Sequence, residues 1–118
     1  MLFNSTKKKQ VMAKTRMAST SWNKLKGLMF ENPEKFDYAL VFILRKESII
    51  EATIHMMFVF FPIDIVYLNK EQKVVDIAQN IRPFTPSYSP KKPSKFFIEL
   101  PVGVAKGISL GDKLEWKE

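Results

Sequence analysis

The sequence feature that most constrains the fold is residues 54–68, the most apolar run of the chain, which Pro62 interrupts. A membrane-spanning helix needs roughly 20 consecutive apolar residues, so a run divided by proline indicates the interior of a globular domain and predicts no membrane span. Aromatic and β-branched residues dominate the run, and such side chains favour a pleated strand over a helix. We therefore predict two strands here, with Pro62 at a strand start or a bulge, where no ladder donor is required.

The composition indicates one folded domain over residues 1–118. With 46% hydrophobic residues, a chain of this length can bury a core without disulfides or metals. Cysteine is absent, which excludes disulfides, thiolate metal sites and cysteine nucleophiles, and with a single histidine we predict neither a metal nor another cofactor. The N-terminal residues lack the apolar segment and cleavage site of a secretion signal, so the expected compartment is the cytoplasm.

The chain is basic, with 19 Lys and Arg residues against 12 Asp and Glu residues and a net charge of +7. This balance favours contact with nucleic acid, an anionic surface or an acidic protein. Arginine, on which base-edge and bidentate phosphate recognition depends, occurs only at positions 16, 45 and 82. The lysine-rich composition therefore indicates a solvated surface or a weak electrostatic binder.

The order of apolar segments and turn residues predicts an α+β domain that is mostly β. We expect about seven short strands and two short helices, with a curled sheet or one closed into a barrel. The predicted segments are a hairpin within 1–18, a helix at 22–29, a strand at 38–44, two strands within 54–68, a hairpin connection at 68–74, strands at 74–78 and 95–100, a helical turn at 101–107 and a strand at 113–116.

Residues 82–95 form a proline-rich segment that cannot pair as an inner strand, so we predict a long extended loop. Cations alternate with aromatic rings along it, as in sites for single-stranded nucleic acid, and proline-rich loops with exposed aromatics also serve as protein-binding epitopes. We favour a protein partner, keep nucleic acid as an alternative, and note that a simple lid over a barrel end is a third interpretation. The predicted partner-binding residues are Arg82, Phe84, Tyr88, Lys91, Lys92 and Lys95.

A second candidate site involves His55, the only histidine, and Asp64. If the strands bring them together, the pair would form the general-base half of a hydrolytic site. No nucleophile in a defined setting accompanies them, so we favour a structural interpretation in which backbone donors or His55 satisfy a buried Asp64. Met56 would line a soft apolar pocket or belong to the core. Three separated carboxylates lack metal-ligand spacing: Asp76, Glu99 and Asp112.

Four pieces of the sequence, in this order and spacing, resemble the conserved family known as domain of unknown function 192. They are Gly27-Leu28-Met29, His55-Met56 with Pro62-Ile63-Asp64, residues 83–88 with 95–101, and Gly103 with Gly111-Asp112. The resemblance implies a compact, β-rich, barrel-like fold over about residues 11–116. It transfers no catalytic role, because the family carries no established activity.

The chain also departs from this family pattern. Many relatives have Trp where His55 stands and Cys where Phe84 and Ser87 stand, and many bacterial members carry a secretion signal. The His55-Met56 form is similar to archaeal, cytoplasmic members, and an aromatic residue in place of His55 argues against an obligatory catalytic base.

We therefore predict a cytoplasmic, non-enzymatic binding or adaptor module that uses the loop at 82–95. The alternative is a small-ligand-binding protein or a hydrolase whose pocket contains His55, Met56 and Asp64. The sequence leaves the oligomeric state open.

Overall fold

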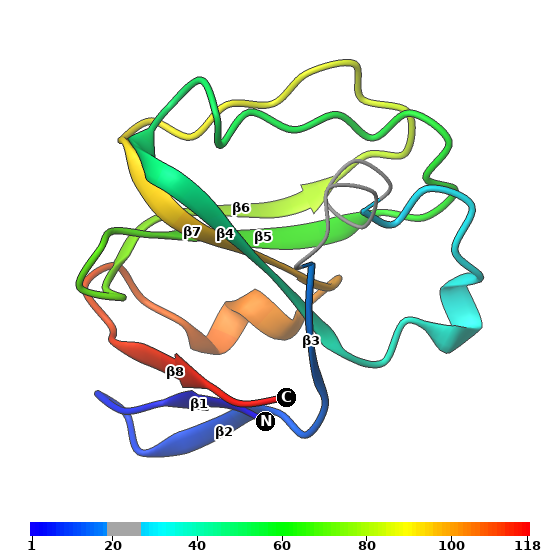
Figure 1. Cartoon of the computed structure of the whole chain (residues 1–118). Helices are drawn as coiled ribbons and strands as arrows, with labels where there is room; N and C mark the ends of the chain where they lie inside the picture. Colours follow the sequence, from blue (N-terminus) through cyan, green and yellow to red (C-terminus); the bar gives the residue numbers. More distant parts are fainter. Residues whose placement is uncertain (19–26) are drawn as a thin grey trace.

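The structure, a computed structural model that describes residues 1–18 and 27–118, contains two β-sheets packed against each other (Figure 1). The smaller sheet has the order β2-β1-β8 and consists of β1 (Leu2–Asn4), β2 (Lys9–Met12) and β8 (Leu114–Trp116). The larger sheet has the order β3-β4-β7-β5-β6 and consists of β3 (Thr15–Met17), β4 (Ala39–Ser48), β5 (Ile63–Leu68), β6 (Val74–Ile81) and β7 (Ser94–Pro101). Among the strands of the described residues, only β3 and β4 pair in parallel.

Strand β5 lies inside the larger sheet, between β6 and β7, and its position explains its composition. All of its residues are buried, because both faces of the strand are covered. A strand covered on both faces needs apolar side chains at nearly every position, which gives a continuous run in place of an alternating one. Strand β6, at the edge of the sheet, instead alternates between buried and more exposed positions over its first half.

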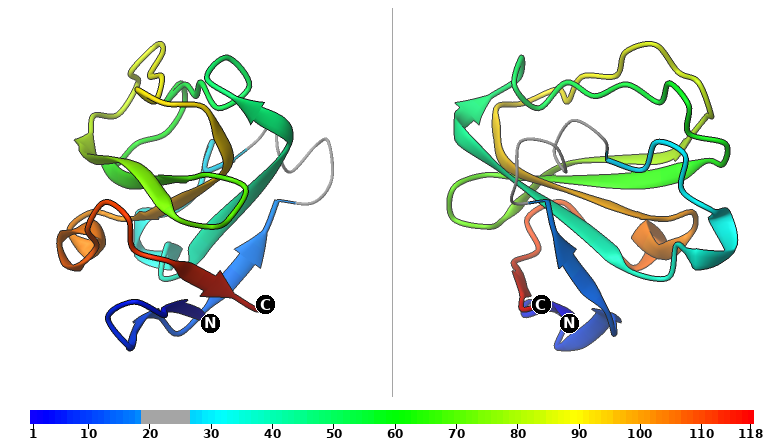
Figure 2. Two further views of the ribbon diagram at one scale, coloured as in Figure 1. Left: turned by 90° about the vertical axis from the view of Figure 1, so that its left-hand side faces the viewer. Right: turned by 45° about the vertical axis from the view of Figure 1, so that its right-hand side comes forward.

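The two faces of the larger sheet are covered in different ways. One, which we call the closed face, packs against the smaller sheet through a cluster that includes Leu2, Val41, Val66, Ile98 and Leu114. The other, which we call the loop face, carries a second cluster that includes Phe42, Met56, Val59, Tyr67 and Phe97. Connecting segments cover the loop face, and residues 49–62 and 82–93 run side by side above it (Figures 1 and 2).

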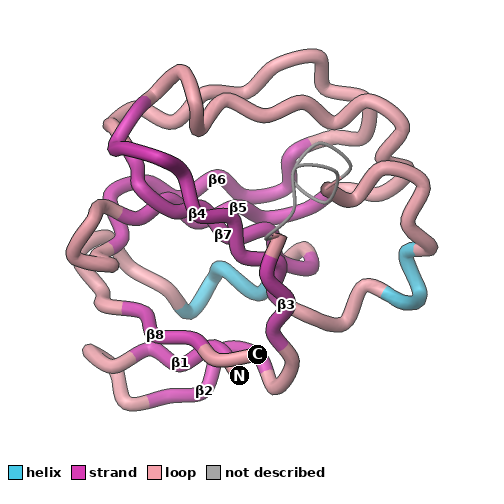
Figure 3. Tube along the Cα trace, in the orientation of Figure 1, coloured by secondary structure: helices cyan, strands magenta, loops and turns pink. Residues whose placement is uncertain are grey.

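Two short 3-10 helices complete the described elements, and Figure 3 shows how much of the remaining chain is loop. The first, η1 (Pro33–Lys35), starts at Asn32, whose side chain accepts a hydrogen bond from the backbone of Glu34. The second, η2 (Val104–Gly107), follows β7 and packs on the closed face through Ala105. Among the described residues, no helix is long and apolar enough to cross a bilayer.

The predicted mostly-β fold class is confirmed, and the part of the chain that the structure describes has eight strands in place of about seven. The larger sheet is curled but not closed into a barrel, because β3 and β6 remain as separate edges. The helical turn predicted at 101–107 is the 3-10 helix η2. Most of the helix predicted at 22–29 lies outside the described residues, and positions 27–29 form a turn.

The prediction of a strand before Pro62 is wrong. Residues 55–61 form an irregular loop, and β5 begins directly after the proline. Phe58 has a φ of 60°, which a strand cannot accommodate, and its side chain is exposed. The segment is therefore apolar for a reason other than strand formation. Some of its side chains line a pocket, and others form a surface patch.

Candidate functional site

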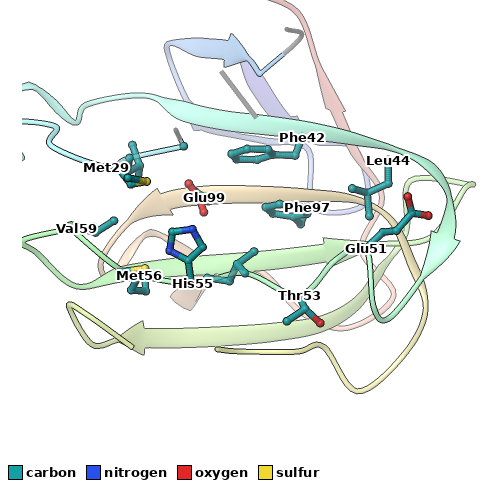
Figure 4. A pocket seen from close by; sticks show the side chains of 13 residues that line it. Met29, Phe42, Leu44, Glu51, Thr53, His55, Met56, Val59, Phe97 and Glu99 are labelled. Carbon is teal, nitrogen blue, oxygen red and sulfur yellow. The ribbon is translucent and has the colours of Figure 1, made fainter. Parts of the chain in front are cut away.

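The loop face contains a cavity of about 210 Å³ between β4, β7 and the segment 51–59 (Figure 4). We call it the Glu99 pocket. Most of its wall is apolar, formed by Gly27, Leu28, Met29, Phe42, Leu44, Ile54, Met56, Val59 and Phe97. Four polar side chains complete the lining: Glu51, Thr53, His55 and Glu99. An apolar pocket with a few convergent polar groups is the usual form of a small-molecule site.

Glu99 is an unusual residue for the middle of a sheet. It lies in β7 between Leu40 of β4 and Ile65 of β5, and its side chain shares the loop face with Phe97. Glu99 is only 6% exposed, and its Oε1 atom is buried without a hydrogen-bond partner among the described residues. Burial raises the pKa of Glu99 to about 8, because the ionised form loses its hydration without gaining donors.

Gly27 allows the backbone to pass close to this carboxyl. Its φ of +51° is one that glycine adopts readily and other residues rarely adopt. A Cβ at this position would lie 3.7 Å from Glu99 Oε1 and 3.7 Å from Phe42 Cζ. Glycine therefore turns the chain at the wall of the pocket without adding a side chain beside Glu99.

The structure brings His55 and Met56 into the same pocket. Met56 is buried, whereas His55 is exposed at the pocket wall. The backbone N–H of Met57 donates to His55 Nδ1 at 3.1 Å, so a neutral imidazole carries its proton on Nε2. Figure 4 shows the imidazole and the Glu99 carboxyl both turned toward the interior of the pocket.

Glu51 supplies a second carboxyl to the pocket. Its Oε1 accepts a hydrogen bond from Arg45 Nε at 3.0 Å, and Arg45 Nη2 lies at the same distance. Its Oε2 is buried and has no partner within the described part of the chain. The pocket is therefore lined by two carboxylates that each retain an unused acceptor.

Asp64 lies elsewhere and serves a different purpose. It is fully buried in β5 and accepts three backbone hydrogen bonds, from Asn80 at 2.9 Å, Gly103 at 2.9 Å and Ala105 at 3.0 Å. These bonds attach the start of η2 to the sheet. Asp64 does not line the Glu99 pocket, so the structure does not bring it together with His55, and its contacts fit the structural interpretation.

The proline-rich loop is attached along its length to the segment that lines the pocket. Tyr88 and Ile54 exchange two backbone hydrogen bonds, of 2.8 and 2.9 Å, and Met56 donates to Thr85 at 2.7 Å. Tyr88 is half-buried, and its ring stacks with Tyr67 at a centroid distance of 6.4 Å. The loop is therefore a fixed wall over the loop face, and Tyr88 is part of that wall.

The predicted cations of this loop lie at its two ends. Arg82 is exposed at the start of the loop, and Lys91 and Lys92 are exposed near its end, where the Lys91 backbone N–H donates to Asp76 at 2.9 Å. Lys95 is already used within the fold, because its Nζ donates to the backbone carbonyls of Leu44 and Arg45. The structure therefore does not gather the six predicted residues into one patch.

Phe84 belongs instead to an aromatic patch that the sequence analysis did not predict. The patch consists of Phe30, Phe58, Phe60 and Phe84, which are between 40% and 66% exposed. The rings of Phe30 and Phe58 stack at 5.1 Å, and those of Phe60 and Phe84 meet edge to face at 5.2 Å. Three members have φ close to 60°, a strained backbone for large side chains. Two neighbouring residues, Met29 and Val59, line the Glu99 pocket, so the patch borders it.

No group of three His, Cys, Asp or Glu side chains suited to a metal ion occurs in residues 1–18 and 27–118. The chemistry available to the Glu99 pocket is therefore that of carboxylates, an imidazole and a hydroxyl in apolar surroundings. Such groups can hold a ligand by hydrogen bonds and charge, or exchange a proton with it.

Glu99 is a candidate functional residue that the sequence analysis missed. The sequence analysis considered Glu99 only as a possible metal ligand, together with Asp76 and Asp112. The available signal was a single charged residue inside the apolar run 96–100. Residues two apart in a strand point to the same face, so Glu99 shares a face with Phe97. Either that face of the strand is polar, or Glu99 is a carboxyl buried in the core.

The fold and the pocket define a class of small, mostly-β protein in which loops enclose a pocket on one face of an open five-stranded sheet. A family model described as an uncharacterized ACR, domain of unknown function 192, matches residues 2–116. The chain belongs to this family.

Relatives from archaea and two crystal structures agree with this assignment. The UPF0127 protein of Pyrococcus furiosus is 36% identical over 117 residues, which is 98% of this chain and 97% of that protein. A UPF0127 protein of Thermococcus sibiricus is 38% identical, covering 99% of this chain and 75% of its own. A protein of unknown function from Novosphingobium aromaticivorans aligns with a TM-score of 0.77 and 30% identity, over 86% of this chain and 74% of that one. A Sinorhizobium meliloti structure at 22% identity shares the fold, with a TM-score of 0.76 over 86% of this chain and 79% of its own.

Proposed function

We propose that the protein is a small-ligand-binding module whose site is the Glu99 pocket. The observation that supports this proposal is the buried Glu99 carboxyl, which has no hydrogen-bond partner among the described residues. A buried carboxyl without partners destabilises a fold, whether it is ionised or protonated, so a ligand that supplies the missing hydrogen bond gives it a purpose. Four separate stretches of the sequence meet at this pocket, namely 27–29, 42–44, 51–59 and 97–99, and all but 42–44 contain residues that contribute to the family resemblance.

A pocket-filling substitution tests this proposal. Leu44 lines the pocket, whereas its neighbour Ile43 is exposed on the same strand. We expect that a thermal-shift screen of small fragments yields compounds that stabilise the wild-type protein and Ile43→Trp but not Leu44→Trp. Compounds that stabilise all three proteins equally bind outside the pocket, and a screen with only such compounds would contradict the proposal.

A second candidate function is the binding of a protein partner through the aromatic patch and the adjoining loop. The supporting observation is the exposure of four phenylalanines in contact with one another, because large exposed apolar patches mark interaction sites. This candidate retains Arg82 and Phe84 from the predicted loop site. Lys91 and Lys92 form a separate basic end, which nucleic acid would use.

Two double variants distinguish these contacts. Affinity capture with Phe58→Ser/Phe84→Ser should lose a protein partner that Lys91→Glu/Lys92→Glu retains. Nucleic acid that is retained by the wild type and lost only by the lysine variant would favour the basic end of the loop. Equal retention by all three proteins would remove this candidate function.

A further inference from the structure

The ionisable side chains of the Glu99 pocket differ from those of the chain as a whole. The protein carries a net charge of +7, yet the described side chains that line the pocket include two carboxylates and neither lysine nor arginine. Arg45 contacts Glu51 through one carboxylate oxygen only, from outside the lining. A ligand cation would therefore meet two carboxyls and no competing lysine or arginine from the described lining, in apolar surroundings that strengthen electrostatic interactions.

The unused hydrogen-bonding groups of the pocket are acceptors. Glu99 Oε1 and Glu51 Oε2 are buried without partners among the described residues. A ligand that satisfies an acceptor must bring donors, and an ammonium group has three donors and no acceptor. An ammonium group also favours the ionised form of Glu99, because a nearby positive charge lowers the pKa that burial has raised. A ligand carboxylate or phosphate would instead bring acceptors and would be repelled by Glu99 in its ionised form.

The remaining wall selects an apolar body. Phe42 and Phe97 line the pocket as a stacked pair with a centroid distance of 4.4 Å, and Met29 and Met56 contribute thioethers that pack well against rings. The volume of about 210 Å³ exceeds the ~150 Å³ of an apolar cavity that accepts benzene. One ring and a short aminomethyl arm therefore fit.

From these observations we infer that the Glu99 pocket binds a small primary amine with an apolar body, whose ammonium group donates to the Glu99 carboxylate. This inference rests on the proposed function and specifies its ligand class. Binding transfers the ammonium from water to a site where its charge and that of Glu99 compensate each other. No covalent step is involved.

Methionine methyl signals give a direct test, because two of the six methionines, Met29 and Met56, line the pocket. The protein is labelled with 13C-methyl methionine and titrated with benzylamine, benzyl alcohol and benzoate at pH 8. We expect benzylamine to shift the Met29 and Met56 signals and to bind about tenfold more tightly than benzyl alcohol, as a charge-assisted hydrogen bond predicts. Benzoate should not bind.

Two substitutions of Glu99 and one control substitution test whether Glu99 causes the preference for benzylamine over benzyl alcohol. Glu99→Gln should bind benzylamine no better than benzyl alcohol, while Glu99→Asp should retain part of the preference. Glu34→Gln, which removes an exposed carboxyl outside the pocket, should behave like the wild type. The unshifted methionine signals of each variant, compared with those of the wild type, show that it is folded.

The outcomes separate the two proposals. Equal binding of benzyl alcohol and benzylamine at the Met29 and Met56 signals would overturn the amine preference and leave the pocket as a ligand site. Stronger binding of benzoate than of benzylamine would likewise overturn the amine preference and leave the pocket as a ligand site. If none of the three probes shifts these two signals at millimolar concentration, the ligand class is wrong, and the fragment screen with Leu44→Trp then decides the proposed function alone.

Discussion

Asp64 and Glu99 are buried carboxylates on neighbouring strands of one sheet, but they face opposite sides. Asp64 lies on the closed face and accepts three backbone hydrogen bonds. Glu99 lies on the loop face and has an oxygen without a partner in the described part of the chain. A carboxylate that receives several N–H donors stabilises the loops that supply them, whereas one without donors is costly unless something else binds it. Burial alone therefore does not distinguish a structural acid from a ligand-binding one, but the donor count does.

Asp112 supports the same distinction on the closed side of the molecule. Burial acts to raise its pKa, but hydrogen bonds from the Asn4 side chain, the Ser109 backbone and Lys7 outweigh this effect and hold the pKa of Asp112 below its usual value. These bonds connect the chain termini, since Asn4 belongs to β1 and Asp112 precedes β8. The closed face is thus held together by satisfied carboxylates at two places.

The largest expected effect is the loss of stability on replacing Asp64. Asp64→Ala leaves the amides of Asn80, Gly103 and Ala105 without their acceptor, and each unsatisfied donor costs on the order of 1–3 kcal/mol when buried. We expect the free energy of unfolding in urea to fall by about 3–5 kcal/mol. Asp37→Ala, at an exposed position, is the matched control and should leave the unfolding midpoint nearly unchanged. A loss as small as that of the control would show that Asp64 does not hold the closed face.

The next largest effect is a gain in stability, which we expect on replacing Glu99. Burial raises the pKa of Glu99 from 4.5 to about 8, so between these pH values the folded protein holds a proton that the unfolded chain releases. The free energy of unfolding of the wild type should therefore decrease as pH rises from 4.5 through 8. Glu99→Gln should lack this decrease and be more stable than the wild type by about 4 kcal/mol at pH 8, with little difference at pH 4.5.

Asp112 gives the mirror-image control for this pH dependence. Because its folded pKa is lowered, its contribution to stability is present at neutral pH and is lost as the pH falls through that value. Asp112→Asn should therefore be less stable than the wild type near neutral pH, with the difference shrinking in acid. Urea unfolding across pH for the two variants would refute the comparison if both deviated from the wild type in the same direction.

The sequence predicted the parts of the fold that depend on local pattern. The continuous run at 38–44 and the polar interval between Tyr67 and Val74 correspond to β4 and to the β5–β6 hairpin. The proline-rich loop predicted at 82–95 corresponds to residues 82–93, between β6 and β7, since proline cannot donate to an inner ladder. These features follow from a strand period or from backbone chemistry and need no knowledge of the neighbours.

The sites could not be predicted in the same way, because they depend on tertiary contacts. Asp64 was near His55 in sequence, but its donors come from the backbone of β6 and of η2. Phe58 and Phe60 have the composition of a strand, but the positive φ of Phe58 places it in a loop. Lys95 looked like a free cation, although two carbonyls of β4 already occupy it. For Asp64 and Lys95 the deciding partners lie far away along the chain.

A smaller effect should come from Lys95, which extends the comparison to a positive charge. Because its Nζ donates to Leu44 and Arg45, Lys95→Ala should lower the free energy of unfolding by about 1 kcal/mol. Lys92→Ala, at an exposed position three residues earlier, should change it by less than about 0.5 kcal/mol. Equal effects would mean that the Lys95 bonds are not formed in solution, and Lys95 would again be available to a partner.

The smallest effect is expected for Tyr67, whose hydroxyl is buried on the loop face without a partner among the described residues. Tyr67→Phe keeps the ring between Tyr88 and Phe97 and removes only the unsatisfied group. Its unfolding free energy should therefore stay within about 0.5 kcal/mol of the wild type, with any change toward greater stability. A loss of 1 kcal/mol or more would reveal a hydrogen bond to this hydroxyl.

Because Tyr67 does not line the Glu99 pocket, Tyr67→Phe should also leave benzylamine binding unchanged. A change in that binding would mean that unsatisfied polar groups across the loop face act together, and not that Glu99 acts alone.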